Sequence, residues 1–549
     1  MKRFLLLPLL AAAVAGPAAA QPSAPAAKSA PSPALPYSAL ITPALLRQHL
    51  TELASDAYEG RETGRPGQAK AAQYLARQFE QLGLRGPVSG GVSAFQQPFG
   101  LVSTTPTAQE KIRVGATQFV HLRDFVRFGP SMFVQSPAPA DPVFMGYGIE
   151  TDTYSDYASG PDVRGRDVIV LDGEPTDAFG SSFLSTTPLT GEWASPFRKA
   201  ALARDKGARS ILVVTGAKPT ELYAYAQPLA AALAEPTYSL TAPVPQPAEL
   251  QQLMEEPPAG ISCFITTAQV GVALLHTTPA LLRRYRQDCY RLRKPAPASF
   301  QPPAVTVELP QKREELTSTN VLGFLEGTDK KDEILVVSAH YDHVGVQHDT
   351  IYNGADDDGS GTSAVLALAR AFTQATADGH GPRRSILFLL NSGEEKGLLG
   401  SEYYAGHPVF PLSQTIADLN IDMVGRTDKV HQGKPDYLYL IGSNRLSTEL
   451  HTLSEATNAQ YSHLGLDYTY NDPNDPEQLY YRSDHYNFAR HRIPIIFYTS
   501  GLHADYHKAT DDVDKIEFDR LAERTQLVFF TAWELANREK RPSLNATRP

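Results

Sequence analysis

The sequence predicts an α/β fold: a mostly parallel central sheet flanked by helices, with a mixed α/β module inserted before it. Two observations lead to this prediction. After residue 300, apolar strand-like runs alternate with helical patterns, as an α/β domain with a largely parallel sheet requires. Residues 126–290 differ, with short strand-like pieces such as PVFMGYGI, DVIVLDG and SILVVTG around a helical run FRKAALARDKGA.

The first residues have the pattern of an export signal. MKRFLLLPLLAAAVAGPAAAQ places Lys2 and Arg3 before an apolar stretch that ends in small residues. The stretch is short and is broken by Pro8, which favours a cleavable signal over residues 1–20 rather than a membrane anchor. A Pro- and Ala-rich tether is expected over 21–38. We therefore expect a secreted or periplasmic protein with no membrane span after signal removal.

Composition narrows the classes of protein and partner. The chain has 549 residues, 42% of them hydrophobic, which is enough for sizeable cores and two or three domains. A net charge of -10 without a Lys/Arg run argues against nucleic acid as a partner. Two cysteines, Cys263 and Cys289, exclude a thiolate metal site and permit either one disulfide or two buried thiols. The oligomeric state stays open.

Apolar residues recur at helical spacing from Leu45, and a second amphipathic run spans Gln68 to Leu82 after the turn EGRETGRPG. Residues 39–125 are therefore assigned to the first part of the main domain. The insert follows over 126–290, then a Pro-rich joint, PAPASFQPPAV, and the rest of the main domain over 300–540. A helix is expected at SGTSAVLALARAFTQA. The expected strands are Ile334 to Ser338, Ser385 to Leu390, Ile416 to Ile421, Tyr437 to Ile441 and Ile493 to Tyr498.

Polar residues follow the ends of these strands, where α/β sheets place ligands. His340 comes directly after the first strand, and Asp342 could accept a hydrogen bond from its ring. NGADDDGSGT offers three carboxylates before a helix. Asp357, the middle one, is the candidate for bridging two cations, although spacing alone does not select it; a solvated acidic loop is the alternative.

Three further segments supply candidates. Glu394 and Glu395 follow a strand and an NSG turn, so that one can bind metal while the other faces its water; two exposed glutamates are the alternative. Asp422 ends an apolar strand and needs a partner, either a cation or Arg426. His503 and His507 lie in a polar loop and are both candidates.

The conjunction of imidazoles and carboxylates from separate loops indicates two divalent cations. Three carboxylates and a bridging hydroxide would neutralise them. Imidazole with carboxylate and without thiolate suits zinc best, with manganese or cobalt possible.

HYDHVG, NGADDDGSGT, NSGEEKGLLGS, NIDMVG and YHKATDD together resemble the secreted di-zinc aminopeptidase family, whose relatives include glutamate carboxypeptidase, glutaminyl cyclase and the transferrin receptor ectodomain. The resemblance covers about residues 315–540 and implies a zinc-peptidase fold. The stretch 126–290 looks more loosely like the protease-associated domain inserted in many members. YRSDHYNF is similar to the family segment RSDHxPF, but Asn487 stands where proline is usual, which puts only the local loop shape in doubt.

The resemblance also implies roles for the candidates. His340 and Asp422 would hold one zinc, Glu395 and His507 the other, and Asp357 would bridge them. Glu394 would be the general base, Asp342 would orient the histidine, and Tyr506 would steady the oxyanion.

The expected function is hydrolysis of peptide bonds in peptide or protein substrates by a zinc-dependent metallopeptidase, most simply an aminopeptidase. A carboxypeptidase or glutaminyl cyclase on the same scaffold is an alternative enzyme. A non-catalytic binding ectodomain is an alternative of another class.

Overall fold

The computed structural model describes residues 33–90, 93–128, 142–186, 191–230, 234–242, 244, 261–473 and 475–546. The predicted signal at 1–20 and most of the tether lie outside them. The described end of the tether is folded: helix α1 (Leu35–Ser38) buries Tyr37, whose ring stacks on Trp533. Among the described residues, none of the helices is both long and apolar enough to cross a membrane.

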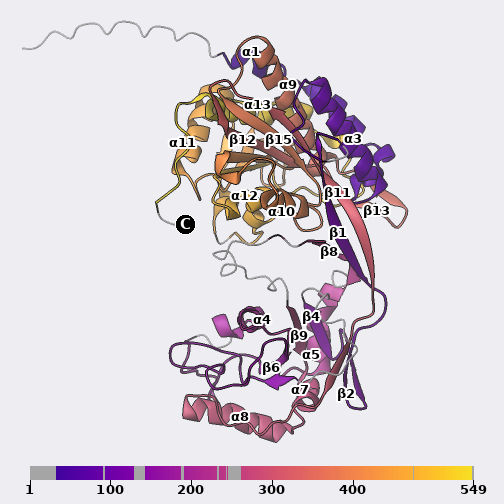
Figure 1. Ribbon diagram of the computed structural model, residues 1–549, viewed down its shortest axis with the longest axis vertical. Helices are drawn as coiled ribbons and strands as arrows, with labels where there is room; N and C mark the ends of the chain where they lie inside the picture. The colour runs from indigo at the N-terminus through magenta and orange to yellow at the C-terminus, as the bar shows by residue number, and fades with distance from the viewer. Residues whose placement is uncertain are drawn as a thin grey trace, which may run out of the picture.

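Two lobes are joined by long strands (Figure 1). The larger lobe is built on a nine-stranded sheet in the order β18-β17-β19-β16-β12-β15-β11-β1-β8. These strands are β1 (Gln96–Pro106), β8 (Thr237–Leu240), β11 (Gln311–Leu325), β12 (Lys330–His340), β15 (Arg384–Asn391), β16 (Thr415–Ile421), β17 (Tyr437–Ile441), β18 (Gly465–Asp467) and β19 (Ile495–Thr499).

The four central strands, β19, β16, β12 and β15, run parallel, and β11, β1 and β8 continue the sheet antiparallel. The sheet is therefore mixed, with a parallel centre where the sequence predicts one. Its central strands are Val-, Ile- and Leu-rich because both faces are covered. Along β12, Leu335 and Val337 pack into one hydrophobic core, and Ile334 and Val336 into the core on the opposite face.

Helices cover both faces of this sheet. The first core is formed with α2 (Pro43–Leu53), α3 (Pro66–Gln81), α9 (Gly361–Ala377) and α13 (Phe518–Asn537), and the second with α10 (Leu399–Gly406) and α12 (His485–Arg490). Helix α11 (Thr448–Thr457) also contributes to the first core through Leu450, and a short hairpin joins β13 (Gly345–Gln347) to β14 (Thr350–Tyr352). The helices predicted near Leu45, over Gln68 to Leu82 and after the Gly-rich turn are confirmed.

The second lobe has a five-stranded sheet in the order β4-β9-β7-β6-β5 and a three-stranded one in the order β10-β2-β3. The strands are β2 (Lys111–Val114), β3 (Thr117–Val120), β4 (Phe125–Phe128), β5 (Val143–Phe144), β6 (Asp167–Leu171), β7 (Ser210–Val214), β9 (Ser262–Thr266) and β10 (Val305–Glu308). Its helices are α4 (Pro196–Asp205), α5 (Pro219–Ala226), α7 (Ala268–Leu274) and α8 (Pro279–Leu292).

This lobe and the range 126–290 do not coincide. Ile112 and Val307 lie outside that range but belong to the core of the second lobe. Thr237–Leu240 lie inside it but pair with β1 in the large sheet. Short alternating segments such as KIRV give too weak a pattern for the sequence to place them. Cys263 and Cys289 are both buried and free.

Candidate metal centre

Three neighbouring parallel strands deliver polar side chains to one edge of the large sheet. His340 is the last residue of β12, and Asp422 directly follows β16. Glu394 and Glu395 follow β15 after a turn at Ser392 and Gly393. Because β15, β12 and β16 are adjacent and parallel, these ends lie together.

The loop before α9 adds Asp357, and the contacts of its neighbours separate the three aspartates. Asp356 accepts a hydrogen bond from the Gly425 amide (2.6 Å), and Asp358 accepts from the Gly361 amide (2.8 Å). The Asp356 and Asp358 carboxylates therefore hold backbone groups, and Asp356 also contacts His503, whereas the Asp357 carboxylate lies against His340 and His507. The structure brings the residue chosen from sequence into the cluster.

A first group forms around His340, which is 1% exposed at its side chain. Its Nε2 lies 3.3 Å from Asp357 Oδ1, 3.6 Å from Asp422 Oδ1 and 3.9 Å from Glu394 Oε2. Glu394 is the farthest of the three from this nitrogen.

A second group shares the same aspartate. His507 Nε2 lies 3.1 Å from Asp357 Oδ2 and 3.0 Å from Glu395 Oε2. His343, which the sequence analysis did not select, places Nδ1 2.8 Å from Glu395 Oε1. The side chain of His507 is 40% exposed, so this group opens to solvent.

Ligand atoms suitable for a metal ion converge in both groups. His340, Glu394 and Asp422 form one set, and His343, Asp357 and Glu395 another, with one atom from each residue within 4.8 Å of the others. Asp357 contributes to both groups, with Oδ1 3.3 Å from His340 Nε2 and Oδ2 3.1 Å from His507 Nε2. A nearly buried carboxylate shared in this way is placed to contact two cations.

Two alternatives from the sequence are resolved by these contacts. Arg426 pairs with Asp505 at 3.0 Å instead of with Asp422. His503 pairs with Asp356 at 3.2 Å, whereas His507 contacts Asp357 and Glu395.

Asp342 and Tyr506 flank the groups. His340 Nδ1 lies 3.1 Å from the main-chain carbonyl of Asp342 and 3.7 Å from its carboxylate, so the carbonyl is the nearer acceptor. The Asp342 carboxylate instead accepts from Thr63 Oγ1 (2.5 Å). Tyr506 stacks on the ring of His507, and its hydroxyl accepts a hydrogen bond from Arg482 (3.3 Å).

The cluster holds more carboxylates than histidines, and its close contacts shift the pKa values of Glu394 and Asp357 in opposite directions. Burial and the neighbouring Glu395 and Asp422 raise the pKa of Glu394 well above its usual value, despite the opposing influence of His340. Burial favours the neutral form of Asp357 as well, but contacts with His340 and His507 outweigh it and hold its pKa well below the usual value. Neighbouring carboxylates thus differ in proton affinity, as an acid–base residue beside a charged ligand requires.

The N-terminal segment around Arg61 supports the loops that form the site. From the sequence, this segment was interpreted only as a turn. Arg61 is fully buried and donates to the carbonyls of Tyr341 (2.7 Å), Asn353 (2.7 Å) and Gly354 (2.9 Å). These carbonyls lie in the loops that carry His340 and Asp357. The sequence offered one signal, a charged residue inside a Gly-rich turn. It could not show the contact of Arg61 with the Tyr341 carbonyl, because the two residues are 280 positions apart.

Ser483 is another contact that the sequence analysis did not select. Its Oγ donates to Asp422 Oδ2 (2.7 Å) and accepts from Asn420 (2.9 Å). Nearby Asn487, which replaces the usual proline, donates to the Leu398 carbonyl (3.1 Å) and Ser401 Oγ (2.8 Å), so the departure is accommodated by contacts to α10.

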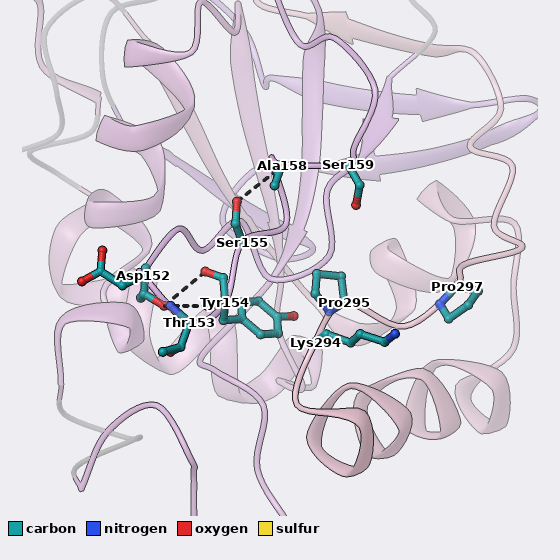
Figure 2. Close-up of a pocket in the computed structure, with 10 residues that line it drawn as sticks. Asp152, Thr153, Tyr154, Ser155, Ala158, Ser159, Lys294, Pro295 and Pro297 are labelled. Atoms are coloured by element: carbon teal, nitrogen blue, oxygen red, sulfur yellow. Dashed lines mark hydrogen bonds between the residues drawn. The ribbon is translucent and has the colours of Figure 1, made fainter.

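A pocket of about 480 Å³ lies elsewhere, in the second lobe (Figure 2). It is lined by Thr151, Asp152, Thr153, Tyr154, Ser155, Ala158, Ser159, Lys294, Pro295 and Pro297. This lining contains neither histidine nor a pair of carboxylates.

Comparison with known proteins identifies relatives of the large lobe. Residues 320–532 match the model of peptidase family M28. Aminopeptidase YwaD of Bacillus subtilis is 29% identical over 234 residues, which are 41% of this chain and 46% of that protein. A vacuolar membrane protease of Aspergillus clavatus is 36% identical over 116 residues, 19% of this chain and 11% of that one. The chain thus spans less than half the length of these relatives.

The fold extends beyond the matched segment. An aminopeptidase from Aneurinibacillus sp. strain AM-1 superposes with a TM-score of 0.51 at 19% identity, over 92% of this chain and 97% of that one. At this identity the likeness establishes a shared fold.

Proposed function

We propose that the chain is a member of peptidase family M28, whose model matches residues 320–532, and that it is an exported aminopeptidase that uses two zinc ions. One observation carries the proposal: the carboxylate of Asp357 stands between two histidines, with Oδ1 3.3 Å from His340 Nε2 and Oδ2 3.1 Å from His507 Nε2. A carboxylate in this position can bridge two cations.

The residues present fit such a pair. Three buried carboxylates and two imidazoles without thiolate are a donor set that zinc prefers. His340, Asp422 and Asp357 would hold one ion, and His507, Glu395 and Asp357 the other. The side chains of Asp357, Glu395 and Asp422 are 4%, 4% and 10% exposed, and holding three carboxylates this close together away from water is costly unless cations balance them.

Bound zinc supplies Lewis-acid polarisation of the scissile carbonyl and lowers the pKa of water from about 15.7 towards about 7. Glu394 accepts the proton of the attacking water and returns it to the departing amine. The hydroxyl of Tyr506, beside His507, donates a hydrogen bond to the developing oxyanion.

A substrate panel tests the proposal. Purified full-length protein is assayed on aminoacyl substrates with free and with blocked amino termini, before and after chelation and after zinc is restored. We expect cleavage of free amino termini alone, lost with chelator and recovered with zinc. Cleavage of N-blocked peptides from the carboxyl end would identify a carboxypeptidase, and cyclisation of N-terminal glutamine without hydrolysis would identify a cyclase. Activity unaffected by chelation contradicts the metal mechanism.

A further inference from the structure

We propose that His343 is a positioning residue: its ring donates a hydrogen bond to one oxygen of Glu395 and thereby turns the other oxygen toward His507 and the cation held there. The inference rests on the proposed function, which assigns Glu395 to a metal ion. It adds a residue that neither the sequence analysis nor the family comparison assigns.

The two oxygens of Glu395 have different partners. Oε1 lies 2.8 Å from His343 Nδ1, and Oε2 lies 3.0 Å from His507 Nε2. His343 Nδ1 is farther, 3.7 Å, from Asp357 Oδ2. The shortest contact of His343 is therefore with the glutamate, at a normal hydrogen-bond distance.

The backbone holds the ring of His343 in place. The side chain is 0% exposed, and the His343 amide donates to the Arg61 carbonyl (3.3 Å). Gly354 packs against the ring: a Cβ at that position would lie 2.4 Å from His343 Cγ, and its φ of +55° is one that favours glycine. Because the His343 ring lies between Glu395 and the backbone at Gly354, its orientation is fixed.

The other ring nitrogen argues for a donor rather than a ligand. His343 Nε2 is buried without a hydrogen-bond partner among the described residues. A metal-bound histidine usually donates its second N–H to an acceptor. If Nδ1 bound the cation, Nε2 would carry a hydrogen with nothing to receive it. If Nδ1 donates to Glu395, Nε2 carries only a lone pair, which is the less costly state.

Side-chain chemistry allows the hydrogen bond to be removed and restored. In His343→Asn the amide nitrogen takes the place of Nδ1 and keeps a donor. In His343→Leu the volume is similar and the donor is lost. His343→Gln places its donor farther out, near the position of Nε2, and replaces the leucine variant if that variant does not fold. His431→Leu is the matched control, because His431 Nδ1 contacts Asp428 at 2.9 Å outside both metal groups.

The readout is metal binding by the full-length protein. Zinc content is measured across a series of buffered free-zinc concentrations, and the visible absorption of the cobalt-substituted protein reports the ligand field. For His343→Leu we expect one of the two ions to bind about 10- to 100-fold more weakly, the range for loss of a partner of a metal ligand. His343→Asn and His431→Leu should bind both ions as the unmodified protein does.

Two results would overturn the inference. Unchanged affinity in His343→Leu would show that Glu395 needs no such partner. Equal weakening in His343→Asn and His343→Leu, with an altered cobalt spectrum in both, would make the ring itself a ligand. Failure of the proposed function is distinguishable, because the unmodified protein would then not bind two ions at all.

Discussion

The two lobes both bury charged groups beside parallel strands, but they treat the charges differently. In the second lobe, Lys199 is fully buried and donates to the carbonyls of Tyr147 (2.5 Å) and Gly173 (2.7 Å), and Asp167 accepts from Arg209 (2.5 Å) and Ser210 (2.7 Å). At the edge of the large sheet, carboxylates instead gather with carboxylates.

The difference lies in whether the buried charges are satisfied by the protein itself. Asp167 accepts hydrogen bonds from Arg209 and Ser210, so the protein itself balances the charge of this buried carboxylate. Asp357, Glu394, Glu395 and Asp422 outnumber the histidines among them, which are His340, His343 and His507. A buried charge alone does not mark a site; a buried charge whose balance requires an added ion does.

The largest expected effect follows from removing the shared carboxylate. Asp357→Ala takes a ligand from both proposed ions, so zinc content should fall from two per chain toward zero and hydrolysis toward the uncatalysed rate. Elemental analysis after dialysis measures the metal. The matched change in the second lobe, Asp167→Ala, should leave zinc unchanged. Two zinc ions retained in Asp357→Ala would contradict the bridge.

A smaller effect separates the base from the ligands. Glu394→Gln keeps the size of the side chain but cannot accept a proton, so the turnover rate should fall by about 100- to 10,000-fold while zinc content stays the same. Steady-state kinetics and elemental analysis on the same sample test this. Full activity in Glu394→Gln would exclude Glu394 as the base, and loss of zinc would make it a ligand.

The smallest expected effect concerns Lys199, the buried lysine of the second lobe. Burial lowers the pKa of Lys199 to about 7 from an ordinary 10.5. Between these values the unfolded chain holds a proton that the folded lobe does not, so the stability contributed by Lys199 rises with pH, by at most about 1.4 kcal/mol per pH unit. Lys199→Met should remove this rise and, by leaving two carbonyls unpaired, cost about 1–3 kcal/mol.

Urea unfolding at pH 7 and pH 9 measures that contribution. The chain has two tryptophans, so in a Trp533→Phe background the fluorescence of Trp193 reports on the second lobe alone. The difference in unfolding free energy between this background and the same protein with the added change Lys199→Met should be larger at pH 9. An equal difference at both pH values would mean that Lys199 stays charged in the folded lobe.

Sequence patterns located the parallel centre of the sheet because each of its strands is a continuous apolar run. The predicted strand at Ile416 to Ile421 is β16 within one residue, and Ser385 to Leu390 is β15 within one residue at each end. The antiparallel half was not predicted, because β11 begins with the polar run QKREELTSTN and pairs with residues more than 200 positions earlier, as in Leu101↔Leu316. Local composition carries little information about such pairing.

The residues of the candidate site likewise divide into those that the sequence could place and those that it could not. Residues directly after a predicted strand, such as His340 and Asp422, could be placed from the sequence. His343 lies three residues past its strand and was passed over, because its contact with Glu395 depends on how the loop folds back. Arg61 and Thr63 come from a distant segment. The Gly-rich turn marks Arg61 as unusual, but the local sequence does not indicate which loops these residues reach.

The position of β8 has a consequence for dissecting the molecule. This strand arises within residues 126–290 yet forms the outer border of the large sheet, where it pairs with Leu101, Val102, Ser103 and Thr104 of β1. A shortened protein lacking 126–290 would therefore lose more than a module. It would leave a row of bare amide and carbonyl groups along β1, a template on which two molecules can join strand to strand and aggregate.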